Sequence, residues 1–134
     1  MRIAFATQSM TAVDAHFGGA RSIAIYDVAK DSSKFIEALQ FDMVSEEDGN
    51  HDDSADKLSI KIDALSGCAM LFTLAIGGPA AARVVAKKIH PVKLPRPEPI
   101  ADVITRLQAT LAGTPPPWMR RIIADHDSAS FMEE

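Results

Sequence analysis

One stretch of the chain, residues 67–88, constrains the fold more than any other. It begins with an apolar run that only Thr73 interrupts. A run without polar alternation fits a strand buried on both faces, as in a parallel sheet covered by helices. Gly77 and Gly78, followed by a proline, then favour a tight turn and a helix start, and the helix should end near Lys87. The stretch therefore predicts a strand, a glycine turn and a helix.

The predicted helix start at Gly77 and Gly78 is a candidate anion site. The first turn of a helix presents backbone N–H groups without internal partners, together with a partial positive charge. The alternative is a tight turn in a parallel sheet with no ligand. No Lys-Ser/Thr pair follows the glycines and no G-x-G-x-x-G is present, so the sequence carries no familiar phosphate-loop motif.

The composition is that of one ordinary globular domain. The chain has 134 residues, of which 47% are hydrophobic and 24% charged. A net charge of −4 argues against nucleic acid or an anionic membrane as the main partner. We find neither a bilayer-length apolar stretch nor a signal-peptide pattern, and therefore expect a cytoplasmic protein.

The metal-binding side chains are few. A self-contained iron–sulfur cluster normally needs about four cysteine thiolates, and Cys68 is the chain's 1 cysteine. An internal disulfide is therefore impossible, and the 4 histidines have spacings unrelated to a structural zinc site.

The remaining elements follow from periodicity and turn residues. Strands 2–7, 22–28 and 34–41 should include an antiparallel hairpin with its turn at 30–33. In the strand 34–41, we expect Phe35 and Leu39 on the same face. The acidic segment 42–56 is expected to be a solvated loop rather than a calcium site. Further along we expect a helix from a cap at 53 or 54 to residue 65, with Ile62 in its apolar stripe. A strand at 90–94 and a stiff connector at 95–99 should follow, then a helix at 100–111 ended by Gly113 and a short helix at 118–123.

This order of elements predicts an α/β fold with a mixed sheet and helices on both faces. We expect a single domain over residues 1–123, followed by an acidic, flexible tail at 124–134. Trp118, near the end of the domain, is interpreted as a packing anchor rather than a ligand platform.

His16 is the leading candidate for ligand chemistry. It follows the first strand in a loop with Phe17 and Gly18, and imidazole is a good iron ligand. The alternative is a surface histidine without a role. If strands 2–7 and 68–73 are parallel neighbours, their carboxyl ends meet and bring His16 beside Gly77. Cys68 lies at the opposite end of its strand, so it is either a small structural residue or a second ligand position.

Enzymatic chemistry has little support in the sequence. No Gly-x-Ser-x-Gly is present, and no Cys–His or Ser–His pair can be assigned. The first strand ends in Thr7-Gln8-Ser9, without the carboxylates that a metal nuclease needs there. We therefore expect no catalytic residues.

Two motifs together resemble the nitrogenase iron–molybdenum cofactor biosynthesis family. They are the segments 13–18 (Val-Asp-Ala-His-Phe-Gly) and 76–82 (Ile-Gly-Gly-Pro-Ala-Ala-Ala). Segment 88–93 is similar to the family's lead into its last strand, although it lacks the glycine that many members carry there. The Pro-Pro-Pro-Trp-Met run at 115–119 resembles the NifX branch, which includes NifY and NafY. The resemblance covers residues 1–123.

This resemblance implies a ribonuclease-H-like three-layer α/β/α fold with sheet order 3-2-1-4-5, and no catalysis. It implies a carrier that binds the iron–sulfur precursor of the iron–molybdenum cofactor, made by the synthase NifB, and passes it to the NifE–NifN scaffold. The family's cluster ligand would be His16, beside Phe17 and Gly18. Gly77 and Gly78 would offer N–H groups to the anionic cluster, and Cys68 is a second-rank ligand candidate.

Two other functions stay open at this stage. One is a nucleotide- or phosphate-binding protein that uses the glycine turn and does not depend on His16. The other is a regulator that binds only other proteins.

Overall fold

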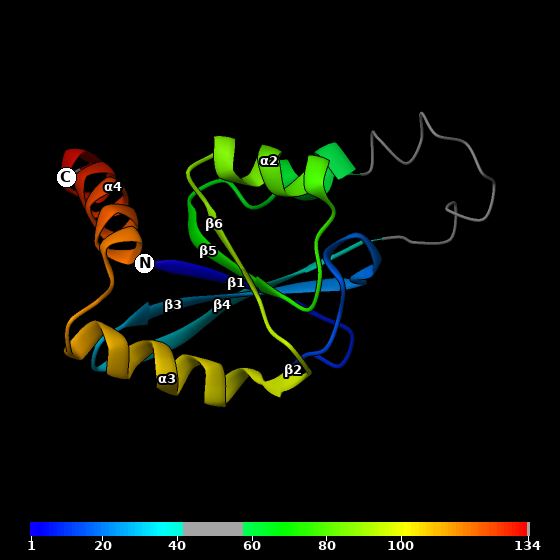
Figure 1. Ribbon diagram of the computed structural model, residues 1–134, viewed down its shortest axis with the longest axis horizontal. Helices are drawn as coiled ribbons and strands as arrows, with labels where there is room; N and C mark the ends of the chain where they lie inside the picture. The colour runs from blue at the N-terminus through cyan, green and yellow to red at the C-terminus, as the bar shows by residue number, and fades with distance from the viewer. Residues whose placement is uncertain (42–57, 134) are drawn as a thin grey trace.

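The computed structural model describes residues 1–41 and 58–133, with side chains described as far as residue 126. Five strands form its central sheet: β1 (Arg2–Thr7), β3 (Ser22–Ala29), β4 (Ser32–Gln40), β5 (Cys68–Thr73) and β6 (His90–Lys93). Their spatial order is β4-β3-β1-β5-β6, which is 3-2-1-4-5 when these five are counted along the chain (Figure 1). β1 pairs antiparallel with β3 but parallel with β5, so the predicted mixed sheet is confirmed.

Helices cover both faces of this sheet (Figure 1). α2 (Gly78–Ala86) and the helical residues 58–63 pack on one side, which we call the α2 face. α3 (Ile100–Ala112) and the start of α4 (Pro117–Glu133) pack on the other side, which we call the α3 face. The helices expected around 79–88 and 100–111 are therefore confirmed, with α3 ending before Gly113 as predicted.

The apolar stripes of the helices form the two halves of the core. On the α2 face, Ile62 and Leu65 meet Ala80 and Val84 over the sheet. The expected cap at residue 53 or 54 lies outside the described residues, as does the acidic segment 42–56. Gly67 follows the helix 58–63 with a φ of +92°, which a residue with a side chain rarely adopts. The α3 face is lined by Val103, Ile104 and Leu107 of α3, together with Ile3, Phe5, Met70 and Phe72 of the sheet.

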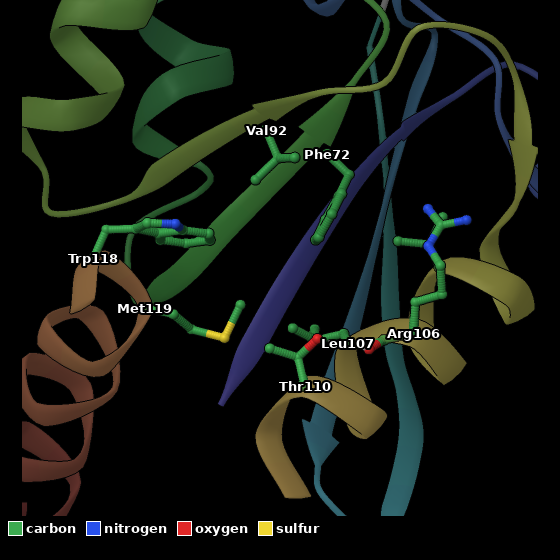
Figure 2. A pocket seen from close by; sticks show the side chains of 8 residues that line it. Phe72, Val92, Arg106, Leu107, Thr110, Trp118 and Met119 are labelled. Carbon is green, nitrogen blue, oxygen red and sulfur yellow. Dashed lines mark hydrogen bonds between the residues drawn. The ribbon is translucent and has the colours of Figure 1, made fainter. Parts of the chain in front are cut away.

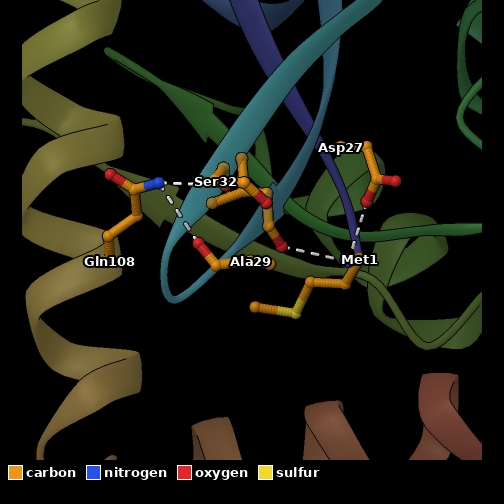
Figure 3. Close-up of polar contacts among 6 residues, drawn as sticks. Met1, Asp27, Ala29, Ser32 and Gln108 are labelled. Carbon is orange, nitrogen blue, oxygen red and sulfur yellow. Dashed lines mark hydrogen bonds and ion pairs between the residues drawn. The ribbon is translucent and has the colours of Figure 1, made fainter.

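The β3–β4 hairpin turns more tightly than expected. The turn predicted over residues 30–33 occupies only Lys30 and Asp31, because Ser32 already pairs with Ala29 in the ladder. Two-residue loops are the commonest hairpin connections. The Gln108 side chain on α3 donates to the carbonyls of Ala29 (3.2 Å) and Ser32 (2.9 Å), so α3 holds the hairpin tip (Figure 3).

A β-bulge changes the facing of β4. The register skips Ile36, since Ile25 pairs with Glu37 whereas Tyr26 pairs with Phe35. Ile36 therefore joins Leu39 on the α2 face, and the Phe35 ring meets Tyr26 edge-on at 5.4 Å. The prediction that Phe35 and Leu39 share a face was wrong, because an extra residue shifts the two-residue alternation.

A second sheet, of two short strands, forms beside the main one. β2 (Ala12–Val13), within the loop after β1, pairs antiparallel with β7 (Glu98–Pro99). The Ile100 N–H, at the start of α3, donates to the Thr11 carbonyl at 3.0 Å. The connector 95–99 and the loop after β1 were predicted without strands, because two-residue strands leave no periodicity to read.

The last helix is longer than predicted. It was expected to end at Ile123 but runs on to Glu133, since no glycine or proline follows Pro117. His126 Nε2 lies 3.1 Å from the Lys88 carbonyl oxygen, which ties this extension to the end of α2. The domain boundary at residue 123 stays a prediction. Within the described residues, no helix combines the length and the apolar character needed to cross a membrane.

Candidate functional site

The candidate site lies where the parallel strands β1 and β5 end. Residues 8–20, which we call the His16 loop, leave β1 and return onto the connection between β5 and α2. The Phe17 N–H donates to the Ala75 carbonyl at 2.8 Å, and the Leu74 N–H donates to the Ala15 carbonyl at 3.0 Å. The predicted proximity of the His16 loop and the glycine turn is therefore confirmed, because Ala75 stands two residues before Gly77.

His16 is exposed at the entry to a single 3-10 turn, η1 (Phe17–Gly19). Its backbone is extended (φ −76°, ψ 146°), while the Phe17 side chain after it is fully buried in the α2-face core. Phe17 thus anchors the turn, and the imidazole stays accessible. Gly18 is exposed beside it, and so are Gly77 and Gly78 at the start of α2.

Thr73, the one polar residue in the apolar run, contributes directly to this junction. Its side chain is completely buried. The hydroxyl lies 3.0 Å from the Ala15 carbonyl oxygen and 3.1 Å from that of Ala75. A buried hydroxyl needs such partners, and here they are the residue before His16 and a residue on the approach to the glycine turn.

Lys61 holds the other side of the loop. It is only 4% exposed, and its Nζ donates to the carbonyls of Phe17 (3.1 Å), Gly18 (3.3 Å) and Ala20 (3.1 Å). The ammonium also lies 5.7 Å from the centre of the Phe17 ring. Lysine has three donors on one nitrogen, so it can serve three converging carbonyls that a neutral side chain could not.

Asp14 fixes the first part of the loop, and the Gln8 side chain joins its start to its end. The Gln8 amide donates to the Gly19 carbonyl (2.8 Å) and accepts from the Arg21 N–H (3.0 Å). The Asp14 carboxylate accepts from the Gln8 N–H at 2.7 Å and from the Thr7 hydroxyl at 3.3 Å. Burial opposes ionisation of Asp14, but these hydrogen bonds and others from Ser9 lower its pKa below the ordinary value.

Cys68 is not brought to His16. It is buried at the start of β5, the opposite end of that strand, and burial raises the pKa of its thiol to about 11. The thiolate is the metal-binding form, so this environment disfavours ligation. His90, at the start of β6, stacks on Trp118 with ring centres 4.0 Å apart. Burial lowers the His90 pKa.

A separate cavity of about 160 Å³ lies on the α3 face (Figure 2). Met119 and Trp118 of α4 enclose it with Phe72 and Val92 of the sheet. Arg106, at its edge, is bonded to Glu98, with Nη2 to Oε2 at 3.1 Å. The cavity is largely apolar, and the His16 loop contributes no side chain to its lining.

The site can offer an exposed imidazole and the backbone N–H groups of a helix start. The buried residues Phe17 and Thr73 hold the backbone that carries them. Among the side chains that the structure describes, in residues 1–41 and 58–126, no three from His, Cys, Asp or Glu are grouped to hold a metal ion. The arrangement suits the attachment of a preformed anionic group through one nitrogen ligand. Sequence reasoning missed the supporting residues Lys61 and Gln8, whereas Thr73 was marked by its place inside an apolar run.

Comparison with known proteins gives the family. The family model described as dinitrogenase iron-molybdenum cofactor matches residues 1–110. The chain is 50% identical to Protein NifX of Sinorhizobium fredii over 125 residues, covering 92% of this chain and 78% of that protein. It is 44% identical to Protein NifX of Rhodobacter capsulatus over 131 residues, covering 98% and 82%. The chain belongs to the dinitrogenase iron-molybdenum cofactor family, as the resemblance indicated.

Two more distant likenesses concern a NifY protein and a solved structure. Protein NifY of Azotobacter vinelandii is 34% identical over 121 residues, which cover 90% of this chain and 47% of that protein. Among solved structures, the crystal structure of PH0822 superposes with a TM-score of 0.60 at 23% identity, covering 81% of this chain and 89% of that one. At that identity the second likeness concerns the fold alone.

Proposed function

We propose that this chain acts in the biosynthesis of the nitrogenase iron–molybdenum cofactor as a non-catalytic carrier. It binds the iron–sulfur precursor that NifB makes and passes it to the NifE–NifN scaffold. Membership in the cofactor family and the extensive similarity to NifX proteins support the biosynthetic role. The cluster is cargo in this proposal, so the protein holds it transiently and performs no chemistry on it.

One observation supports the carrier role above the others. The exposed His16 stands directly before Phe17, whose N–H is bonded to Ala75 at the approach to α2. Imidazole nitrogen and the positive end of a helix therefore share one edge of the sheet, next to the exposed Gly77 and Gly78. An anionic iron–sulfur cluster matches both, with His16 as its iron ligand and the backbone N–H groups of Gly18, Gly77 and Gly78 facing its sulfides.

The experiment is an anaerobic titration of the purified protein with isolated NifB cofactor, followed by gel filtration and iron analysis. We expect iron to travel with the wild-type protein. In His16→Ala, binding should be at least about tenfold weaker, which corresponds to about 1.4 kcal/mol. His126→Ala is the matched control, because His126 on α4 contacts the Lys88 carbonyl after α2 and lies outside the His16 loop.

The possible results separate the proposed functions. Iron on the wild type and on His126→Ala, but not on His16→Ala, supports the carrier. Equal binding by all three proteins would contradict His16 as the ligand. If no protein retains iron, the carrier proposal fails, and titration with inorganic phosphate and nucleotides then tests the glycine turn as a phosphate site.

A further inference from the structure

The buried Lys61 has no place in the proposed function as stated so far. It comes from the helical residues 58–63, some forty residues away from His16 in sequence, yet its ammonium donates to three carbonyls of one short turn. Among the described residues it is the only charged residue that is buried. Burying a lysine is costly unless its donors are satisfied, so a position of this kind calls for a reason.

The three acceptors show what Lys61 does to the turn. In a trans peptide, the carbonyl of one residue and the N–H of the next point in opposite directions. The Phe17 carbonyl points to Lys61, so the Gly18 N–H points away from it, on the exposed side of the turn. The Gly18 carbonyl also faces Lys61, so Lys61 fixes the peptide planes that follow Phe17 and Gly18.

Apart from the Gln8 amide, which donates to the Gly19 carbonyl at 2.8 Å, the two glycines of the turn have few restraints other than Lys61. Gly18 and Gly19 have open space where a side chain would stand, so no packing of their own restrains them. The hydrogen bonds inside the turn are Gly19 N–H to His16 carbonyl (3.1 Å) and Ala20 N–H to Phe17 carbonyl (3.4 Å), and the second is long. Lys61 therefore supplies a direct contact at Gly18, where glycine leaves the backbone free, and further contacts at Phe17 and Ala20, on either side of the two glycines.

We infer that Lys61 is the positioning residue of the cargo site: by binding the carbonyls of Phe17, Gly18 and Ala20, it fixes His16 and turns the Gly18 N–H outward as a second donor to the cargo. The inference rests on the proposed carrier function for the identity of the cargo. Lys61 itself does not touch the cluster. It acts through the backbone that it holds.

The test has two readouts, and the first needs no cargo. Amide hydrogen exchange of the cargo-free protein is measured in the wild type, in Lys61→Met and in Lys87→Met. Lys87 is the matched control, because its ammonium pairs with Asp63 at 3.1 Å near the same helix without contacting the loop. We expect exchange at Phe17, Gly19 and Ala20 to rise by about tenfold or more in Lys61→Met, relative to amides of β1, and to stay unchanged in Lys87→Met.

The second readout is binding of isolated NifB cofactor to the same proteins under anaerobic conditions. We expect about tenfold weaker binding by Lys61→Met and unchanged binding by Lys87→Met. Unchanged exchange in a folded Lys61→Met would overturn the inference, and so would faster exchange with unchanged cofactor binding. If the wild type binds no cofactor, the carrier function fails while the exchange experiment still decides whether Lys61 positions the loop.

If Lys61→Met does not fold, Lys61→Arg replaces it in both measurements. A planar guanidinium keeps the charge but cannot direct three donors from one atom to three carbonyls. Faster loop exchange and weaker cofactor binding in Lys61→Arg would support the inference. Wild-type exchange and binding in that variant would overturn it.

Discussion

The two faces of the sheet are closed by different kinds of interaction. On the α3 face, apolar side chains of α3, α4 and the sheet meet, and an open cavity remains beside Trp118 (Figure 2). On the α2 face, a comparable apolar core also encloses Lys61 and the buried ring of Phe17. Packing is non-directional and tolerates small shifts, whereas hydrogen bonds to a charged donor fix individual peptide groups. The face that orders its backbone in this way is the face beside His16.

The largest expected effect comes from two matched core substitutions, Phe17→Ala and Phe72→Ala. Each removes a buried phenylalanine, one from each face, and each is expected to lower the free energy of unfolding by about 3–5 kcal/mol. Only Phe17→Ala should also weaken binding of isolated NifB cofactor, because only Phe17 anchors the turn that begins at His16. Urea unfolding gives the stabilities, and binding is measured at a temperature where both variants are folded. Equal loss of binding in the two variants would show that the faces do not differ in this respect.

Cys68→Ala tests whether the buried end of β5 takes part in binding. We expect cofactor binding to stay unchanged and the free energy of unfolding to fall by about 1 kcal/mol, as for a small buried apolar group. In the wild type, a thiol pKa of about 11 instead of the reference value of 9.0 leaves roughly a hundredfold less thiolate at pH 8. Alkylation by iodoacetamide, followed by mass spectrometry, should be slower by at least that factor than for an exposed cysteine. Rapid alkylation, or loss of cofactor binding in Cys68→Ala, would reinstate Cys68 as a ligand.

The smallest expected effect concerns Trp118 and His90 on the α3 face. Removing the stacked indole in Trp118→Ala should lower the free energy of unfolding by about 0.5–1.5 kcal/mol. Burial holds the His90 pKa below 6.5 in the folded protein, so the unfolded chain binds more protons below that pH. The wild type should therefore lose stability as the pH falls from about 6.5 through the folded-state pKa of His90. Above about pH 6.5, His90 should cause no change in stability.

Trp118→Ala exposes His90, so its pKa should rise toward 6.5 and the acid sensitivity should shrink. An NMR titration of the His90 ring, combined with urea unfolding at several pH values, checks both statements. A wild-type His90 that titrates at its ordinary pKa would contradict them.

The sequence allowed much of the fold to be predicted, because the main elements carry strong local patterns. The apolar run before Gly77, the stripe that includes Ile62 and the stop at Gly113 each predicted an element that the structure contains. Single-residue effects were not predictable. The sequence around Ile36 carries no signal for a bulge, because its neighbours fit a regular strand equally well. The ribonuclease-H-like assignment that the family resemblance implied stays a prediction.

The candidate site was likewise predictable in its overall position but not in its individual side-chain contacts. Parallel pairing of β1 and β5 was enough to bring the His16 loop to the glycine turn. The side chains that secure it were not foreseen, since Lys61 and Gln8 act over long sequence separations and look like ordinary surface residues in the sequence. Thr73 was noticed in the sequence as the one polar residue of an apolar run, but its bonds to Ala15 and Ala75 were not predicted. The roles of His16, Gly18, Gly77 and Gly78 in binding stay predictions for the titration experiments.

The His16 loop is held along most of its length, from the Thr11 carbonyl bonded to Ile100 to the Ala20 carbonyl bonded to Lys61. A chain segment restrained in this way has little conformational entropy left to lose when a ligand arrives. The same segment also gains little conformational entropy when the ligand departs. For a carrier, this means that relaxation of the loop contributes almost no favourable free energy to release of the cargo. Transfer would then depend on the stronger ligands that a recipient offers, and the direction of delivery would be set by the receiving protein.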